Sequence, residues 1–179
     1  MNRTLFTVPA FLSPTECSEI IREAEQLGFG PAPITTGFGF RMVPEVRNNT
    51  RVMVDDLELA RRLWARLLDV VELEPVRGWH PIGLNERFRY YRYTSGQAFR
   101  WHRDGAFVRH EAEQSLLTFM VYLNEGFGGG ATEFEHRSVV PETGHALVFE
   151  HGLRHQGAEV THGTKYVLRS DILFERRSD

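Results

Sequence analysis

The stretch Arg87-Phe-Arg-Tyr-Tyr-Arg-Tyr93 decides the fold class, because aromatic side chains dominate it and aromatic residues favour β-strands. Three further runs rich in aromatic and β-branched residues follow it, separated by Gly, Asn and Pro. They cover residues 117–123, 146–149 and 166–174. The second half of the chain is therefore expected to form short antiparallel strands that make a sandwich or a jelly roll.

Two amphipathic helices are expected before these strands. Ser13 can cap the first helix, Pro14 suits its first position and Glu16 completes a capping box, while Gly28 ends it. The second helix runs from about Asp56 to residue 71. The expected buried residues are Cys17, Ile20, Ile21, Ala24 and Leu27 in the first helix and Leu59, Leu63, Trp64, Leu67, Leu68 and Val71 in the second. We therefore expect an α+β fold whose N-terminal helices pack on one sheet.

Length and composition are typical of a folded globular chain, with 179 residues, 41% of them hydrophobic and 25% charged. We expect a single domain over residues 1–179, with a helical support region over about 1–80 and a jelly-roll core over about 81–179. The net charge of -3 gives no sign of a nucleic-acid or anionic membrane partner. No apolar run is long enough to span a membrane. A single cysteine and the lack of a hydrophobic leader lead us to expect a cytoplasmic protein.

The tripeptide His102-Arg-Asp104 is the first candidate for metal binding. Residues two apart on a strand project from the same face, so the imidazole and the carboxylate can reach one ion. A third ligand must come from a distant segment, and periodicity cannot choose between His151 and His155. Two histidines and one carboxylate are typical of non-heme Fe(II) oxygenases, and Lys165 offers a positive charge for an anionic co-substrate. Taken alone, however, each histidine is more often a structural residue than a ligand.

These motifs resemble the prolyl 4-hydroxylase-like branch of the Fe(II)/2-oxoglutarate-dependent dioxygenase family. The resemblance is carried by Tyr93-Thr-Ser-Gly-Gln-Ala-Phe-Arg-Trp-His-Arg-Asp104 and His155-Gln-Gly-Ala-Glu-Val-Thr-His-Gly-Thr-Lys165, with further segments at residues 11–16, 121–125, 129–134 and 141–149. It implies a double-stranded β-helix (jelly roll). It also implies that His102, Asp104 and His155 bind iron, and that Lys165, ten residues after His155, pairs with the distal carboxylate of 2-oxoglutarate.

The resemblance suggests further contacts to 2-oxoglutarate. Tyr122 would donate its hydroxyl to the same carboxylate, and it shares strand parity with Thr118 and Met120; the alternative is a packed core tyrosine. Tyr93 and Thr132 would line the pocket. Arg169 has the strand parity of Lys165 and is the alternative clamp for 2-oxoglutarate.

The expected activity is hydroxylation of an aliphatic C–H bond with Fe(II), 2-oxoglutarate and O2, releasing succinate and CO2, with ascorbate as the supporting reductant. Asp104 argues against a halogenase, because halogenases of this family lack the carboxylate. The expected substrate is a prolyl or other residue in a peptide or protein, and the alternative substrate is a free amino acid or another small molecule. Two alternative functions stay open as well: a cupin-like metal protein and a non-catalytic jelly-roll binding module. Arginines around the motif can either hold an acidic substrate group or form a solvated strand face: Arg41, Arg47, Arg51, Arg87, Arg89, Arg100, Arg103 and Arg109. Neither the oligomeric state nor a lid over residues 37–51 can be predicted.

Overall fold

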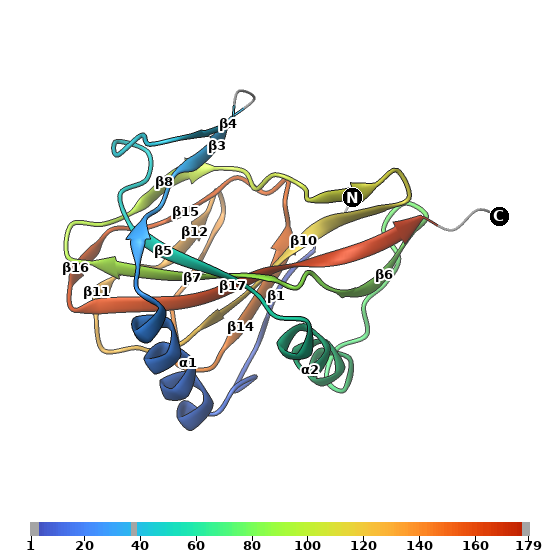
Figure 1. Ribbon diagram of the computed structural model, residues 1–179, viewed down its shortest axis with the longest axis horizontal. Coiled ribbons are helices and arrows are strands. Elements are labelled where there is room, and N and C mark those ends of the chain that lie inside the picture. Colours follow the sequence, from blue (N-terminus) through green and yellow to red (C-terminus); the bar gives the residue numbers. More distant parts are fainter. Residues whose placement is uncertain (1–3, 37–38, 177–179) are drawn as a thin grey trace.

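The computed structural model describes residues 4–36 and 39–176, and it consists mainly of β-strands with two helices (Figure 1). The elements are, in chain order, β1 (Leu5–Val8), α1 (Pro14–Leu27), β2 (Gly30–Pro31), β3 (Ile34–Thr36), β4 (Gly39–Arg41), β5 (Thr50–Asp55), α2 (Leu57–Leu68), β6 (Trp79–Leu84), β7 (Arg87–Thr94), β8 (Phe99–His102), β9 (Val108–His110), β10 (Glu113–Tyr122), β11 (Gly128–Gly129), β12 (Thr132–Phe134), β13 (Arg137–Val139), β14 (Ala146–Glu150), β15 (His155–Gly157), β16 (Val160–His162) and β17 (Thr164–Arg176). The four expected strand runs correspond to β7, β10, β14 and β17.

Two sheets carry most of the strands. The larger has the order β1-β14-β10-β17-β7-β5-β2, with β6 added on β17 and β9 on β10. The smaller has the order β13-β12-β15-β8, and two further pairs join β11 with β16 and β3 with β4. Neighbouring strands are antiparallel throughout the two main sheets. The sandwich-like, mostly β architecture agrees with the sequence.

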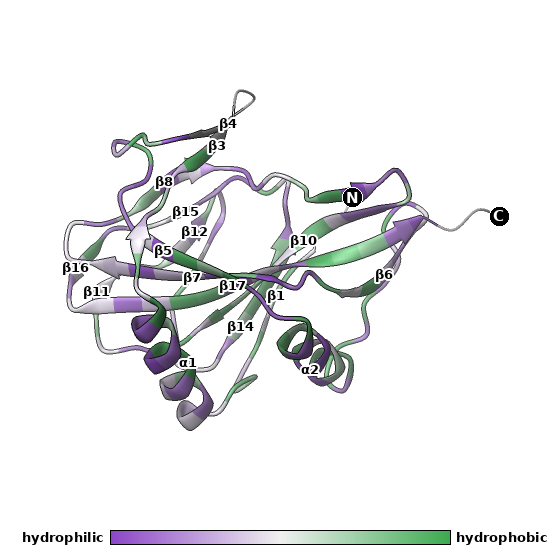
Figure 2. Ribbon diagram, in the orientation of Figure 1, coloured by the Kyte–Doolittle hydropathy of each residue, from purple (hydrophilic) through white to green (hydrophobic). Residues whose placement is uncertain are grey.

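The central strands β10, β14 and β17 of the large sheet are buried on both faces, and their side chains alternate between two hydrophobic clusters. On β10, Phe119 and Val121 belong to a cluster shared with both helices, whereas Met120 and Tyr122 belong to a second cluster that includes Phe134 of the small sheet. Side chains that alternate along a strand point to opposite faces, which explains the almost continuous apolar runs. Figure 2 shows hydrophobic colour along much of the central strand β17.

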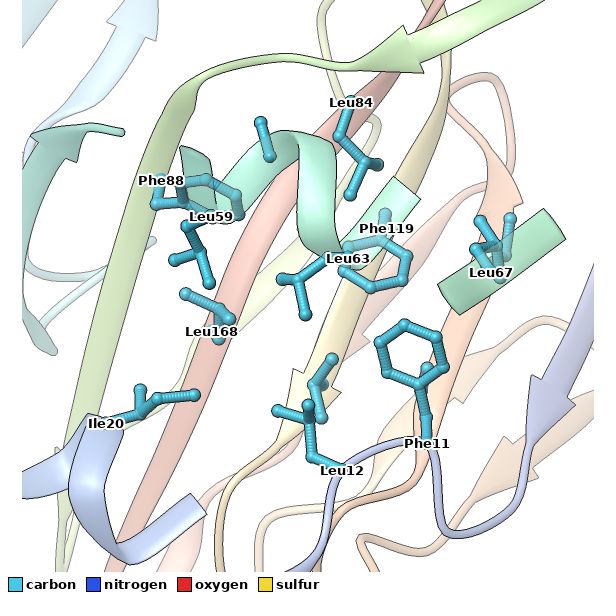
Figure 3. Packing of buried hydrophobic residues seen from close by; sticks show 14 of the residues in the cluster. Phe11, Leu12, Ile20, Leu59, Leu63, Leu67, Leu84, Phe88, Phe119 and Leu168 are labelled. Atoms are coloured by element: carbon cyan, nitrogen blue, oxygen red, sulfur yellow. The ribbon is translucent and has the colours of Figure 1, made fainter. Parts of the chain in front are cut away.

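Both helices contribute to the first of these clusters. Ile20 of α1 and Leu63 of α2 lie in the same cluster as Phe88, Phe119 and Leu168 of the large sheet. Figure 3 shows these labelled side chains pointing toward one another between the helices and the strands. The face of the large sheet that carries the second cluster is thereby left for the small sheet and the site between them.

The helix ends follow the expected signals. Ser13 accepts from Glu16 N and the Glu16 side chain accepts from Ser13 N, so the capping box is present. Gly28 ends α1 with φ +82°, a conformation that favours glycine. Two predictions about burial are wrong, because Leu27 and Leu68 are 58% and 49% exposed. Each is the last residue of its helix, beyond the turns that face the sheet.

The first eighty residues are less helical than expected, since they also supply strands to the large sheet. β1 pairs with β14, and β5 pairs with β7. Residues 34–36 and 39–41 form the β3–β4 pair, and positions 37 and 38 lie outside the described residues. Neither helix of the described chain is long and apolar enough to cross a membrane.

Candidate metal centre and adjoining pocket

Three potential ligands converge on the face of the small sheet. His102 ends β8, His155 begins β15, and the two residues are register partners on neighbouring strands. Asp104 follows two residues after His102, and one donor atom from each of the three side chains lies within 4.8 Å of the others. Asp104 Oδ1 is 3.7 Å from His102 Nε2, and its Oδ2 is 3.8 Å from His155 Nε2. The structure thus brings together the three residues that the sequence singled out for a metal.

Both histidines are held in the tautomer that leaves Nε2 free. His102 Nδ1 lies 2.7 Å from the carbonyl oxygen of Arg100, and His155 Nδ1 lies 3.0 Å from that of Leu153. A carbonyl can only accept, so each Nδ1 donates and each Nε2 keeps its lone pair. Burial lowers the pKa of His102 to about 4 and also lowers the pKa of His155. Both rings are therefore neutral at neutral pH, as metal ligation requires.

The Asp104 side chain is only 8% exposed, yet its carboxyl group is ionised. Burial alone would raise the pKa of its carboxyl group, but the charge of Arg169 and the two histidines holds that pKa well below its usual range. Arg169 Nη2 is 3.1 Å from Asp104 Oδ2, and the Thr118 hydroxyl donates to the same oxygen at 2.6 Å. A second carboxylate, that of Asp171, contacts both Arg169 at 3.1 Å and Arg89 at 3.0 Å.

Aromatic rings fix the planes of the two imidazoles. Phe99 stacks on His102 with centroids 3.5 Å apart and 14° between the ring planes. The guanidinium of Arg47 also lies over Phe99, 4.3 Å from the centroid of that ring. His155 packs edge-on against Phe149, with centroids 4.6 Å apart. These contacts restrict the rotamers of both imidazoles. The side chains therefore lose little conformational entropy when an ion binds.

His151, the alternative candidate ligand, has hydrogen-bond partners instead of a place among the grouped ligands. Its Nε2 lies 2.8 Å from Ser115 Oγ and its Nδ1 lies 2.9 Å from Thr118 Oγ1. Both ring nitrogens therefore have hydrogen-bond partners, and His151 is not part of the group formed by His102, Asp104 and His155. Burial lowers the pKa of His151, which keeps the ring neutral.

A pocket extends from these three residues to Lys165 on β17. Its lining includes Tyr91, Tyr93, Thr118, Thr132, Lys165 and Arg169. Lys165 is only 3% exposed, and its Nζ donates at 2.6 Å to the carbonyl oxygen of Gly130. Its Nζ also lies 5.3 Å from the ring centroid of Tyr93. Burial lowers the pKa of Lys165 to about 7. An anionic ligand that neutralises this buried ammonium would be bound strongly.

Glycine is required beside this lysine. Gly130 has φ +70°, and a Cβ there would lie 2.9 Å from the Phe127 ring and 3.2 Å from Lys165 Cδ. At Gly129 a Cβ would lie 2.2 Å from the carbonyl oxygen of Glu159. The Gly-Gly pair therefore lets the chain pass close enough for the Gly130 carbonyl to hold the ammonium group.

Of the other residues expected to contact 2-oxoglutarate, some line the pocket and one does not. Tyr93 and Thr132 line the pocket. Tyr122 is fully buried and is not among the lining residues; its hydroxyl donates to Thr132 Oγ1 at 2.7 Å. Arg169 lines the pocket beside Asp104 rather than beside Lys165.

Sequence reasoning missed the contributions of Phe99 and Tyr91, and it offered Arg47 only as one of several arginines that could hold an acidic substrate group or face solvent. Tyr91 has the strand parity of Tyr93, a signal that could have placed it in the pocket. Burial would raise the pKa of Tyr91, but Arg47, Arg169 and Arg89 lower it to about 8. Arg47 comes from a segment that shows no periodicity. Its bridge to Phe99 brings it to the site, together with hydrogen bonds that join Val46 to Arg100 and Asn48 to Ala98.

The donor set fits Fe(II). Two neutral imidazole nitrogens and one carboxylate are the ligands of the facial arrangement in which half of an octahedron stays open. Each imidazole donates its Nδ1–H to a backbone carbonyl, and the carboxylate itself accepts a hydrogen bond. Metal-binding side chains normally have such hydrogen-bond partners.

Comparison with known proteins agrees with this chemistry. Residues 88–170 match the family model of the 2OG-Fe(II) oxygenase superfamily. A viral collagen prolyl hydroxylase from Paramecium bursaria Chlorella virus-1, solved as a 2OG complex, is 20% identical, with a TM-score of 0.63 over 96% of both chains. A Pseudomonas putida prolyl-4-hydroxylase is 17% identical, with a TM-score of 0.68 over 98% of this chain and 94% of that one. No curated protein sequence matches the chain significantly.

A third solved structure extends the likeness to a peptide complex. It is a Trichoplax adhaerens prolyl hydroxylase with a hypoxia inducible factor peptide fragment, 14% identical, with a TM-score of 0.72 over 96% of this chain and 84% of that one. At such identities these structures show a shared fold. The segment matched by the family model contains His102, Asp104, His155 and Lys165. The match of residues 88–170 to the 2OG-Fe(II) oxygenase superfamily, together with the grouped His102, Asp104 and His155, supports a dioxygenase that uses Fe(II), 2-oxoglutarate and O2.

Proposed function

We propose that the protein hydroxylates an aliphatic C–H bond in a peptide or protein, with a prolyl residue as the favoured target. One O2 and one 2-oxoglutarate are consumed, one oxygen atom enters the new alcohol and the other enters succinate, and CO2 leaves. The observation that carries the proposal is one pocket that joins His102, Asp104 and His155 to the buried ammonium of Lys165. We further propose that a single domain over residues 1–179 holds both the metal site and Lys165. We also propose that the protein is cytoplasmic and that ascorbate supports turnover.

In this proposal His102 Nε2, His155 Nε2 and one oxygen of Asp104 hold the iron. When bound there, Fe(II) supplies the redox chemistry that activates O2 for attack on a C–H bond. The chain contributes fixed geometry: backbone carbonyls set both tautomers, and Phe99 and Phe149 hold the two rings. The three ligands are grouped within a pocket that also reaches Lys165, and we propose that 2-oxoglutarate and O2 bind in that pocket.

Lys165 is proposed to bind the distal carboxylate of 2-oxoglutarate. Its ammonium is buried with a carbonyl oxygen as its hydrogen-bond partner, whereas Arg169 already pairs with Asp104 and Asp171. The Tyr122 hydroxyl donates to Thr132 Oγ1, which leaves the Thr132 hydrogen free to point into the pocket. We propose that Thr132 donates to the same carboxylate and that Tyr122 orients Thr132.

A peptide substrate is supported by the architecture shared with prolyl hydroxylases, one of which was solved with a peptide fragment. Fold likeness is a weaker warrant than site chemistry, so the substrate class needs its own measurement. The alternative substrate is a free amino acid, which would need only the pocket and no extended groove.

The test begins with anaerobic titration of the Fe(II)-loaded protein with 2-oxoglutarate. We expect a visible metal-to-ligand charge-transfer band in the wild type and none in Asp104→Ala. Oxygen is then admitted, and succinate is assayed with proline-containing peptides and, in parallel, with free amino acids. We expect peptides to stimulate succinate formation and to gain the mass of one oxygen atom. Stimulation by free amino acids alone would replace the peptide assignment, and absence of the band despite bound iron would overturn the proposed function.

A further inference from the structure

A chain of four hydrogen bonds, buried at its centre and part-buried at both ends, ends on the carboxylate of Asp104. The backbone N–H of Phe107 donates to Ser115 Oγ at 2.8 Å, and Ser115 Oγ lies 2.8 Å from His151 Nε2. On the other side of the ring, His151 Nδ1 lies 2.9 Å from Thr118 Oγ1, which donates to Asp104 Oδ2 at 2.6 Å. Ser115 and Thr118 are fully buried, and His151 is 7% exposed.

Only one arrangement of hydrogens satisfies every link. An ionised carboxylate accepts only, so the single hydroxyl hydrogen of Thr118 goes to Asp104. His151 must then donate from Nδ1 to Thr118, which leaves Nε2 as the acceptor for the Ser115 hydroxyl. The lone pairs of Ser115 Oγ in turn receive the Phe107 N–H. The four links therefore run in one direction, toward Asp104.

The guanidinium of Arg169 reaches the same oxygen from another side. Its Nη2 is 3.1 Å from Asp104 Oδ2, and Asp171 holds it in place at 3.1 Å. The Arg169 Nη2 hydrogen bonds go to Asp171 Oδ1 at 3.1 Å and to Thr118 Oγ1 at 3.4 Å, so its contact with Asp104 Oδ2 is an ion pair. Oδ2 thus has both a hydrogen-bond donor, Thr118, and the nearby charge of Arg169. Although Oδ2 also lies 3.8 Å from His155 Nε2, Oδ1 is the oxygen that accepts no hydrogen bond within the described chain.

The backbone reinforces this anchoring. Asp104 N donates to the carbonyl oxygen of His151 at 3.1 Å, and His151 N donates to that of Leu116 at 3.1 Å. His151 thus contacts Asp104 through its main chain and, by way of Thr118, through its ring. This double connection links the loop after β8, which holds Asp104, to the turn after β14, which holds His151.

We propose that Thr118, His151 and Ser115 are positioning residues that turn the Asp104 carboxylate so that it binds Fe(II) through Oδ1 alone. This inference rests on the proposed function. A carboxylate that bound through both oxygens would occupy a position needed for 2-oxoglutarate or O2. His151, one of two candidate ligands in the sequence, thus serves the metal through two hydrogen bonds instead of binding it.

The first test compares Thr118→Val with Thr118→Ser. Valine has nearly the same shape as threonine but no hydroxyl, so Asp104 Oδ2 loses its hydrogen-bond donor and keeps only the ion pair with Arg169; serine keeps the hydroxyl. Anaerobic Fe(II) titration should show affinity about tenfold or more weaker in Thr118→Val and within about threefold of the wild type in Thr118→Ser, the range found when partners of metal ligands are removed. The charge-transfer band of the Fe(II)·2-oxoglutarate complex should shift or weaken in Thr118→Val only.

The second test compares His151→Leu with His151→Asn. Leucine removes the donor to Thr118, whereas the Asn side-chain nitrogen lies near the position of Nδ1 and restores an N–H. We expect His151→Leu to raise the Fe(II) dissociation constant. In His151→Asn, the increase in the logarithm of that constant should be at most half as large. Thermal unfolding of each metal-free variant identifies the folded proteins, and if Thr118→Val does not fold, the His151 pair decides the question.

The outcomes separate this inference from the proposed function. If the wild type forms no charge-transfer band with Fe(II) and 2-oxoglutarate, the proposed function fails and the inference fails with it. If the wild type forms the band, and folded Thr118→Val and His151→Leu match it in affinity and spectrum, only the inference is overturned. Loss in both pairs with rescue by Ser and Asn is the result that the hydrogen-bond chain requires.

Discussion

Lys165 and Arg169 lie four residues apart on β17 and both line one pocket, yet their charged groups meet different partners. Lys165 Nζ donates to a backbone carbonyl, that of Gly130, whereas Arg169 Nη2 contacts two carboxylates, those of Asp104 and Asp171. The arginine is thus neutralised within the protein. The lysine has kept its capacity to neutralise an incoming anion.

Replacing Lys165 with methionine should raise the KM for 2-oxoglutarate about a hundredfold, because a buried charge-assisted hydrogen bond contributes up to roughly 3 kcal/mol. Fe(II) affinity should stay close to that of the wild type, since Lys165 is not among the three grouped ligands. Succinate formation against 2-oxoglutarate concentration gives the KM, and anaerobic titration gives the metal affinity. An unchanged KM would remove Lys165 as the clamp.

The affinity for 2-oxoglutarate should fall as the pH rises above about 7. Burial lowers the pKa of Lys165 to about 7, so the ammonium loses its proton above that pH. The dissociation constant should then increase by up to about tenfold per pH unit. Lys165→Arg should flatten this dependence, because arginine stays protonated. A dissociation constant that is constant between pH 7 and pH 9 in the wild type would contradict the assignment.

The same lysine should make the metal-free protein more stable at alkaline pH. Its pKa in the folded protein lies below that of the unfolded chain, so between about pH 7 and the ordinary lysine pKa of 10.5 the unfolded state binds more protons. The free energy of unfolding therefore rises with pH across this window. Urea denaturation at pH 7 and pH 9 measures the rise, and Lys165→Met should remove most of it.

Iron binding should resist mild acid. Burial lowers the pKa of His102 to about 4 and also lowers that of His155, so the rings stay neutral well below the usual histidine range. Fe(II) affinity should change little between pH 8 and pH 6 and fall as the pH approaches about 4. Anaerobic titrations across this range give the profile. A loss centred near the ordinary histidine pKa would show that the rings are more exposed to water.

The elements that the sequence predicted well are those that local chemistry determines. The capping box at Ser13 and Glu16 is a contact between residues three apart, and strand alternation on β10 follows from its own pattern. Burial at the helix ends was predicted wrongly, because periodicity shows which side of a helix is apolar but not how far the neighbouring sheet extends. That is why Leu27 and Leu68 were expected inside.

Within the site, the types of residue were predictable but several contacts were not. His102 and Asp104 share a tripeptide, so their proximity follows from the chain itself. The role of His151 depends on Thr118, which is brought near by the pairing of β10 with β14, where Thr118 is the partner of Phe149. No property of the segment around His151 encodes that register.

The corrected helix faces can be tested by a pair of leucines on α2. Leu63 is 1% exposed and Leu68 is 49% exposed. Leu63→Ala should lower the free energy of unfolding by about 3 kcal/mol through lost burial and a cavity, whereas Leu68→Ala should change it by less than about 0.5 kcal/mol. Urea denaturation measures both. Equal effects would mean that α2 is rotated relative to the sheet.

The stack of Phe99 on His102 should matter for the metal and not only for the fold. The rings are nearly parallel, and the guanidinium of Arg47 also lies over Phe99, so this ring restricts rotation of the imidazole. Trp101 is a matched control, because it lies on the same strand, is 37% exposed and contacts Arg154 instead of the metal group. Phe99→Leu should weaken Fe(II) binding about tenfold, as expected for a residue that orients a ligand, and Trp101→Leu should leave it within about twofold. Anaerobic titration of both folded variants measures the difference, and equal affinities would show that backbone hydrogen bonding alone is enough to hold His102.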